Sequence, residues 1–460
     1  MRKRDCIPPL AGEPARRMMA IYEEWFKGKP ELSILGMLGV FGRRAPGDEI
    51  ATLRAAPVIA GLTDAVVGLR ESVWNTAVTA LGDVRLVVVE GEREGAEVLD
   101  AHPLVREHFG EQLRREQPEA WREAHRRLYE HLKEKAKPLP ETVEEMAPLY
   151  AAVVHGCRAG MGQEARREVL QERIQRGDAY FNIRKLGAIS SEVAVYAAFF
   201  DPPWEQLASG LTEPDQAWVL GCAGFGLRAL GRLHEAAGLM RMGLERCVAQ
   251  ESWEQAAVSA SNLSELLQAR GELREALGLA VKSVQLADES GNAFRPMLNR
   301  TTLAAVQHAM GLREQAAMEF EEAERMQKER QPSFPQLYSH QGFRYCDLLL
   351  DQGRGAAVRE RAEQALRIAE HNHWLLAIAL DHLSLGRAHL LAVKRRAGGD
   401  LTQATFHLTA AVDGLRRAGT QHHLPLSLLA RATLHTHTRA VPLARKDLDE
   451  ALSLSTRCGF

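Results

Sequence analysis

The sequence predicts a mainly α-helical protein, in which a small N-terminal winged-helix domain with a β-hairpin precedes an α-solenoid of helical hairpins. The solenoid is predicted by self-similarity, because the motif that begins at Gly231 returns at Gly271 and Gly311. Each glycine is followed five residues later by an alanine, giving Ala236, Ala276 and Ala316. A fixed period of about 40 residues is typical of repeats that bury apolar surface only against their neighbours. The β-hairpin is predicted by residues 84–100, where β-branched residues interrupt the helical pattern.

Length and composition fit a globular protein of more than one domain. The chain has 460 residues, of which 45% are hydrophobic and 26% charged. A net charge of -2 gives no field that would attract nucleic acid or an anionic membrane. No run of about 18 apolar residues and no secretory signal is present, so we expect no membrane partner. The six cysteines are scattered without a CxxC pair, which favours a reducing, cytoplasmic location.

Residues 31–118 carry the winged-helix pattern, and a helix over residues 14–27 precedes it. We assign residues 1–30 to the end of a preceding helical region. The apolar periodicity and the β-branched run give helices, then two strands, then a closing helix. In chain order these elements are predicted at residues 31–40, from residue 48, at 72–81, 84–90 and 97–100, and from Pro103.

The third helix of a winged-helix domain often reads DNA, but here residues 71–80 contain no Lys or Arg. Neutralising phosphates requires cations at the groove. We therefore do not expect nucleic acid as a partner, and a winged-helix transcription regulator is kept only as an alternative.

Residues 119–213 are predicted to form a helical adaptor that contains one degenerate repeat with its turn at Gly160. The adaptor begins with a strongly charged helix over residues 119–137, in which we expect His125 and His131 to be solvated. Two further helices are predicted over residues 174–186 and 191–200.

Residues 214–460 are predicted to form the repeat array, with about six helix pairs of roughly 40 residues each. The pattern resembles the tetratricopeptide template, in which two antiparallel helices meet at a glycine turn. An alanine lies where the second helix crosses the first, because a small side chain lets the helices approach closely. Two further crossing positions are predicted at Ala404 and Ala444.

Motifs for catalysis and metal binding were sought without success. The HExxH pattern fails after His234, and no GxSxG motif is present. Nine of the seventeen histidines lie between His371 and His437, a clustering that does not by itself bring ligands together. We therefore predict no catalytic residues, no metal site and no enzymatic activity.

Three segments resemble the bacterial STAND proteins, which are signal-transduction ATPases related to NACHT and NB-ARC proteins. They are residues 18–25 (MMAIYEEW), 32–40 (LSILGMLGV) and 99–109 (LDAHPLVREHF). The resemblance implies the part of such a protein that follows the nucleotide-binding domain: a winged helix and then a tetratricopeptide-like sensor. It also implies a role in bacterial defence.

No GxxxxGK[ST] phosphate-binding loop occurs in the sequence, so the chain alone is expected to bind no nucleotide. It would begin where the ATPase core of the family ends. ADP or ATP would be involved only if a P-loop domain is supplied by a partner in trans or by a missing segment. In the family a histidine at the start of the closing helix contacts ADP. Only His102 matches that motif here, and the alternative is that it merely shapes the junction between strand and helix.

The concave face of the predicted array is formed by the first helix of each pair. By template position, the side chains that face it include Arg228, Glu265, Gln268, His308 and Asp347. Their mixed charge and hydrogen-bonding capacity suit a peptide or protein segment, although these residues could also be merely solvated.

The leading hypothesis is a sensor and protein-interaction module of a STAND-like signalling system, acting by a shift of population on ligand binding. The alternative is a tetratricopeptide scaffold that works without any nucleotide.

Overall fold

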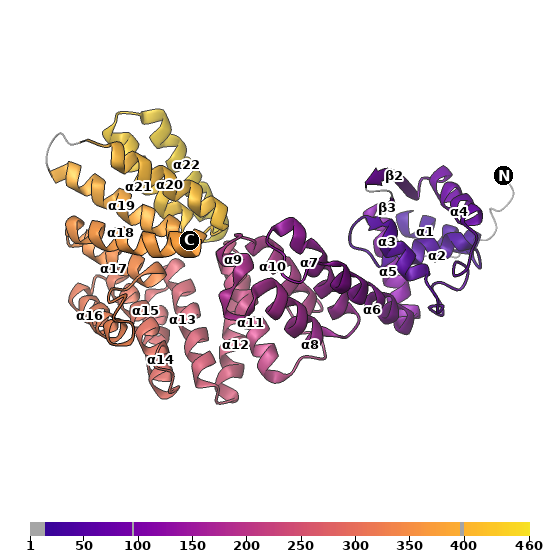
Figure 1. Ribbon diagram of the computed structural model, residues 1–460, viewed down its shortest axis with the longest axis horizontal. Coiled ribbons are helices and arrows are strands. Elements are labelled where there is room, and N and C mark those ends of the chain that lie inside the picture. Colours follow the sequence, from indigo (N-terminus) through magenta and orange to yellow (C-terminus); the bar gives the residue numbers. More distant parts are fainter. Residues whose placement is uncertain (1–13, 94–95, 396–399) are drawn as a thin grey trace. The chain divides into compact units, whose positions relative to one another are not determined.

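The computed structural model describes residues 14–93, 96–395 and 400–460, and it divides into two compact units that meet between Arg173 and Ile174. This boundary lies inside the segment 119–213 that was predicted as one adaptor. The prediction of a mainly helical chain with a small sheet and a tetratricopeptide-like helical solenoid is confirmed. Each unit is described by itself (Figure 1).

Unit 1 contains the small antiparallel sheet, whose strand order is β1-β3-β2. Ala45 of β1 pairs with Leu99 of β3, and Val88 of β2 pairs with Asp100 of β3. Its elements are α1 (Pro14–Phe26), α2 (Pro30–Gly39), β1 (Ala45–Pro46), α3 (Gly47–Arg54), α4 (Glu71–Asp83), β2 (Val87–Arg93), β3 (Ala96–Ala101), α5 (Pro103–Glu116), α6 (Pro118–Lys135), α7 (Val143–Arg158) and α8 (Gly162–Glu164).

The core of unit 1 is held together by close packing of α2 on α5. At their crossing Gly39 faces Gly110, and a Cβ atom on Gly39 would lie 2.8 Å from the Cα atom of Gly110. Buried side chains of α2, α4, β3 and α5 surround this contact. The apolar run at residues 31–40 is thus a largely buried helix, because it packs against α1, α4, α5 and β3.

Several sequence predictions in unit 1 need correction. Strand β2 begins at Val87 rather than at residue 84, because α4 continues to Asp83 and Arg85 then turns the chain with φ 58°. Strand β2 also continues to Arg93, past the predicted end at residue 90, and residues 94–95 between the strands lie outside the described residues. His125 is not solvated but fully buried, with its Nδ1 atom 2.7 Å from Nδ1 of His155. The Nε2 atom of His131 lies 2.9 Å from the carboxylate of Asp48.

A π-helix, η1 (Ala165–Gln175), leads from α8 across the unit boundary. Beyond it the predicted helix at residues 174–186 is wrong. The chain instead forms a 3-10 turn, η2 (Gly177–Ala179), and a short helix, α9 (Phe181–Arg184), because Arg176 and Tyr180 adopt positive φ values. A helix does form next, α10 (Ile189–Tyr196), and η3 (Ala197–Phe199) ends it.

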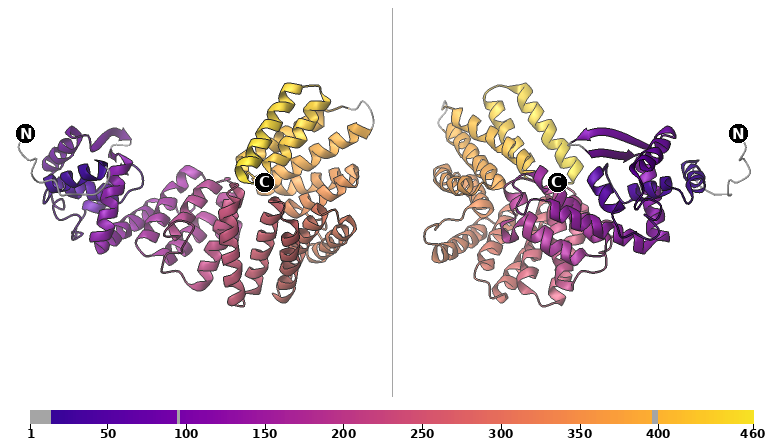
Figure 2. Two further views of the ribbon diagram at one scale, coloured as in Figure 1. Left: turned by 180° about the vertical axis from the view of Figure 1, so that it is seen from behind. Right: turned by 45° about the vertical axis from the view of Figure 1, so that its right-hand side comes forward.

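From residue 213 onward, unit 2 consists of consecutive helical hairpins that stack side by side in chain order (Figure 1). Viewed from behind in Figure 2, the hairpins coloured pink to yellow follow a curved path. Their helices are α11 (Glu213–Ala229), α12 (Leu233–Ala249), α13 (Trp253–Ala269), α14 (Leu273–Glu289), α15 (Arg295–Ala309), α16 (Arg313–Arg330), α17 (Ser339–Asp351), α18 (Gly355–Asn372), α19 (Leu375–Arg395), α20 (Thr402–Ala418), α21 (Leu424–His437) and α22 (Val441–Cys458).

The repeated glycines occupy equivalent turns. Gly231, Gly271 and Gly311 have φ values of 77°, 78° and 80°, in the left-handed region that glycine adopts without strain. In each turn the glycine N–H donates to the carbonyl three residues earlier, and the following residue donates to the carbonyl five residues earlier. The crossing residues Ala236, Ala276, Ala316, Ala404 and Ala444 are buried.

Unit 2 curls far enough that its first hairpin contacts its last. The Gln421 N–H donates to the Ala229 carbonyl over 2.7 Å. Gly231 lies so close to Cys458 that a Cβ atom on the glycine would be 2.8 Å from the Cβ of Cys458. We call these contacts the seam. The seam therefore joins the two ends of the curved array.

One described helix, α19, is long and apolar enough to cross a bilayer by length and composition alone, over Leu375–Lys394. It packs between α18 and α20, and 56% of its apolar window is buried, as expected for a core helix of a solenoid.

Candidate functional site

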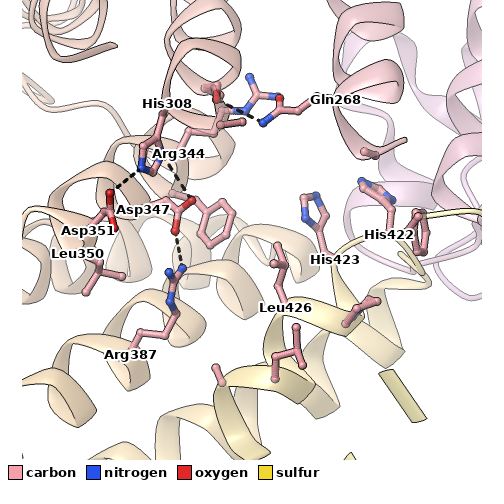
Figure 3. Close-up of a pocket in the computed structure, with 18 of the residues that line it drawn as sticks. Gln268, His308, Arg344, Asp347, Leu350, Asp351, Arg387, His422, His423 and Leu426 are labelled. Carbon is pink, nitrogen blue, oxygen red and sulfur yellow. Dashed lines mark hydrogen bonds and ion pairs between the residues drawn. The ribbon is translucent and has the colours of Figure 1, made fainter. Parts of the chain in front are cut away.

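A cavity of about 890 Å³ lies on the concave side of unit 2. Its wall is built from the first helix of each successive hairpin, namely α11, α13, α15, α17, α19 and α21, with the end of α22 beside them. Figure 3 shows side chains from several of these helices around the cavity.

The base of the cavity holds a buried ion network of Arg228, Glu265 and Arg344. The Arg228 guanidinium donates from Nη1 to Oε2 of Glu265 over 2.7 Å, and Arg344 contacts the other carboxylate oxygen. Arg344 also donates to the Thr302 hydroxyl over 2.9 Å. Burial by itself would raise the pKa of Glu265. The positive charges of Arg344 and Arg228 outweigh this effect and hold the pKa well below its usual range.

A second ion network lines another part of the wall. Asp347 accepts from Nη1 of Arg387 over 2.7 Å, and its other oxygen is 3.9 Å from Nδ1 of His308 (Figure 3). Nε2 of His308 is 3.5 Å from Asp351, which also pairs with Arg313 at 2.7 Å. The two carboxylates, Asp347 and Asp351, and the two guanidinium groups, Arg387 and Arg313, balance in charge.

Three histidines approach the Arg228–Glu265–Arg344 network from α17 and from the start of α21. The rings of His340 and His423 have centroids 5.3 Å apart, and those of His422 and His423 are 4.1 Å apart. Burial, with Arg228 and Arg344 nearby, lowers the pKa of His423 to about 3. Burial likewise lowers the pKa of His340 and of His422, so all three are neutral at pH 7.

The remaining wall is apolar and is contributed mainly by α17, α19 and α21. Leu426 and Leu429 are 48% and 47% exposed, although both are large apolar side chains. Their exposure toward a cavity leaves apolar surface that an occupant would bury. The apolar side chains of the wall are Phe343, Leu350, Leu390, Leu391, Leu426, Leu429 and Phe460.

The structure brings all five side chains that were assigned to the concave face into the cavity wall: Arg228, Glu265, Gln268, His308 and Asp347. Gln268 donates to the Ala305 carbonyl over 3.3 Å, so part of its capacity is already used. That these residues bind a ligand stays a prediction.

His102 lies elsewhere, in unit 1. It is the N-cap of α5, and its exposed imidazole accepts from the Leu104 N–H over 3.3 Å. A contact with nucleotide stays a prediction.

The sequence reasoning missed Arg344, Arg387, His423 and the leucines of α21. Arg344 could have been found from the repeat pattern. It lies nine residues before the turn glycine Gly353, one helical turn further from that glycine than Asp347, which was predicted to face the cavity. In the last hairpin Arg439, with φ 59°, takes the place of the turn glycine. The leucines of α21 were missed because they lie further before this turn than the positions used for the other repeats. Among the described residues, no group of three or more His, Cys, Asp or Glu side chains is arranged to hold a metal ion.

Comparison with known proteins gave no match to a family model and none to a curated protein. Distant likenesses to solved structures were found, among them the following three. A Rap protein complexed with Competence and Sporulation Factor aligns with a TM-score of 0.48 at 11% identity, over 84% of this chain and 92% of that one. The apo form of RapI aligns with a TM-score of 0.42 at 12% identity, over 58% and 92%.

A STAND protein with a tetratricopeptide repeat sensor from Pyrococcus horikoshii aligns with a TM-score of 0.35 at 14% identity, over 95% of this chain and 68% of that one. At these identities and scores, none of the three likenesses assigns a function to this chain.

Proposed function

We propose that the cavity of unit 2 binds a peptide or an extended segment of a partner protein. The observation that carries this proposal is the composition of the wall, in which consecutive hairpins supply paired polar groups and α21 of the last hairpin supplies exposed leucines. A peptide offers backbone groups that can form hydrogen bonds with the polar groups of the wall, and apolar side chains that can pack on the leucines. The volume of about 890 Å³ is in the range of sites that enclose a ligand of several residues.

A binding role is favoured over a catalytic one by the way the carboxylates of the wall are used. Glu265, Asp347 and Asp351 each pair with at least one arginine. For Glu265, Arg344 and Arg228 hold the pKa well below its usual range, which makes this carboxylate a poor general base.

We further propose that residues 31–118 are a winged-helix domain and that the chain is the sensor part of a STAND-like system. The order helix, strand, helix, helix, strand, strand from α2 to β3 supports the first part, together with the strand order β1-β3-β2. The three sequence segments that resemble STAND proteins support the second. Any nucleotide would then come with a P-loop ATPase acting in trans.

A cytoplasmic location is part of this proposal. It is supported by the cysteines that the structure describes, which are all free thiols, as in proteins of a reducing compartment. They are Cys157, Cys222, Cys247, Cys346 and Cys458.

The test compares two leucine-to-glutamate variants. Leu429→Glu places a charge on the cavity wall, whereas Leu452→Glu places the same charge on α22 at a residue that does not line the cavity. Random heptapeptides are first selected for binding to the full-length chain. Their affinities for the wild type and both variants are then measured by isothermal titration calorimetry.

We expect Leu429→Glu to weaken binding at least about tenfold, because burying an unpaired carboxylate is costly. Leu452→Glu should leave the affinity unchanged. Selected peptides that bind both variants equally well would place the binding surface outside the cavity and contradict the proposal.

A further inference from the structure

The ion network at the base of the cavity is one negative charge short. Arg228 and Arg344 are two cations, and among the described residues Glu265 is the only carboxylate that forms an ion pair with either of them. The Arg228 side chain is 4% exposed, that of Arg344 is 10% exposed and that of Glu265 is 15% exposed. The excess of one positive charge is therefore held away from water, which is unfavourable unless an anion compensates it.

The neighbouring histidines do not supply or remove this charge. His340, His422 and His423 are neutral at pH 7, because burial lowers the pKa of each. The carboxylates Asp347 and Asp351 are already matched by Arg387 and Arg313. The excess charge thus stays at Arg228 and Arg344.

Hydrogen-bonding groups around the network also lack partners. His423 is 8% exposed and lines the cavity, yet its Nε2 atom has no hydrogen-bond partner. The same holds for Nε of the 3% exposed Arg228 and for Nδ1 of His422. A buried polar atom without a partner costs free energy that a bound ligand would recover.

The two histidines precede a helix that starts at the cavity. His423 is the N-cap of the 14-residue helix α21, and Leu424, the first residue of that helix, is followed by the cavity-lining Pro425 and Leu426. Figure 3 shows the His422 and His423 rings next to each other, with Leu426 below His423. The N-terminal end of a helix carries partial positive charge and favours an anion. The guanidinium groups, the unpartnered nitrogens and the helix end therefore favour the same kind of ligand group.

We propose that the peptide bound in this cavity presents a carboxylate to Arg228, Arg344 and His423, while its apolar side chains contact Leu426 and Leu429. This inference rests on the proposed function and names the ligand chemistry of the same site. A carboxylate supplies the one negative charge that is missing, and its planar shape fits the guanidinium donors. A phosphate dianion would bring more negative charge than the network lacks. The carboxylate comes from an Asp or Glu side chain or from the C-terminus of the peptide.

The experiment uses synthetic random heptapeptides in two matched sets, one with C-terminal acids and one with C-terminal amides. Both sets are selected on the full-length protein and identified by mass spectrometry. Each selected peptide is then resynthesised with its Asp or Glu replaced by Asn or Gln, or with its C-terminal acid amidated. These changes are made in the peptide, so they leave the fold of the protein unaltered.

We expect neutralising the peptide to weaken binding to the wild type at least about tenfold. Enrichment only in the acid set would identify the C-terminus as the source, and acidic residues in both sets would identify a side chain.

Two protein variants should change the affinity in opposite directions. Arg344→Gln removes the excess positive charge and should weaken binding of the acidic peptides at least about tenfold, with little effect on the neutralised ones. Glu265→Gln increases the excess and should strengthen binding of the acidic peptides. A purely structural role of the network would make both variants bind more weakly.

The inference is overturned if selected peptides are sensitive to Leu429→Glu but bind equally well after neutralisation, or if Glu265→Gln and Arg344→Gln weaken binding alike. In either case the proposed peptide site itself would stand. If no selected peptide is sensitive to Leu429→Glu, the proposed function fails, and this inference fails with it.

Discussion

At the residue scale, the buried pair of His125 and His155 is a feature with a direct energetic consequence. The two Nδ1 atoms are 2.7 Å apart, so one ring donates to the other, and both rings are buried between α6 and α7. Burial, with Arg158 nearby, lowers the pKa of His155 to about 3. Burial and the neighbouring His155 also hold the pKa of His125 well below its usual range.

The pair should make unit 1 sensitive to acid. Because the folded pKa values are lowered, the unfolded chain takes up protons first as the pH falls below about 6.5, and stability is lost from there downward. For His155 alone the loss at pH 5 is about 2 kcal/mol. This loss of stability is measured by urea unfolding at pH 7 and at pH 5, for the wild type and for the double variant His125→Leu/His155→Leu. The wild type should lose more stability than the variant, and equal losses would show that the pair is not buried.

The burial of His125 could partly have been predicted. It follows Ala124 and lies one helical turn before Leu128 and Tyr129, on the buried face of α6. Its charged sequence neighbours suggested a solvated side chain instead. Its partner could not have been predicted, because His155 lies on another helix and only the packing of α6 on α7 brings the two rings together.

At the element scale, the π-helix η1 caps the C-terminal end of α6 through Arg173. The guanidinium of Arg173 donates to the carbonyl groups of Lys133, Ala136, Lys137 and Pro138, over distances of 2.8 to 3.2 Å. The carbonyls of Lys133 and of the C-cap residue Ala136 have no partner in a regular helix end, and a cation there also interacts favourably with the helix dipole.

Arg173→Ala should therefore lower the free energy of unfolding of unit 1 by about 2–3 kcal/mol, since it leaves several carbonyls without a donor. Arg122→Ala on the exposed face of α6 is the control and should stay within about 0.5 kcal/mol. Thermal unfolding followed by circular dichroism compares the two. Similar melting temperatures for both variants would show that Arg173 does not cap α6.

Elements that carry a local signal were predicted well from the sequence. The turns at Gly231, Gly271 and Gly311 follow from the need for positive φ, and the hairpins follow from the spacing of glycine and alanine. The π-helix and the short turns after Arg173 were missed, because they depend on tertiary contacts rather than on local periodicity.

At the scale of unit 2, the seam is the feature that no local pattern reveals. Each hairpin adds a small rotation, and the sum decides whether the first and last hairpins meet. The sequence therefore predicted a concave wall and five of its side chains, but it could not show that the two ends of the array touch.

The seam can be tested with two equivalent glycines. Gly231 and Gly271 have φ values of 77° and 78°, so alanine is equally strained at both. A Cβ atom at Gly271 would meet open space, whereas one at Gly231 would meet Cys458. Gly231→Ala should therefore lower the free energy of unfolding by about 1–3 kcal/mol more than Gly271→Ala, by the cost of overpacking. Equal losses in urea unfolding would show that the two ends of the array do not touch.

The contact between Ala229 and Gln421 also limits how far the cavity can widen. It joins the end of α11 to the segment that precedes α21, and these two parts of the chain supply Arg228 and His423 to the cavity wall. Any motion that moved these two sides of the wall apart would have to break this hydrogen bond, so the solenoid cannot spread at this point while the seam is kept.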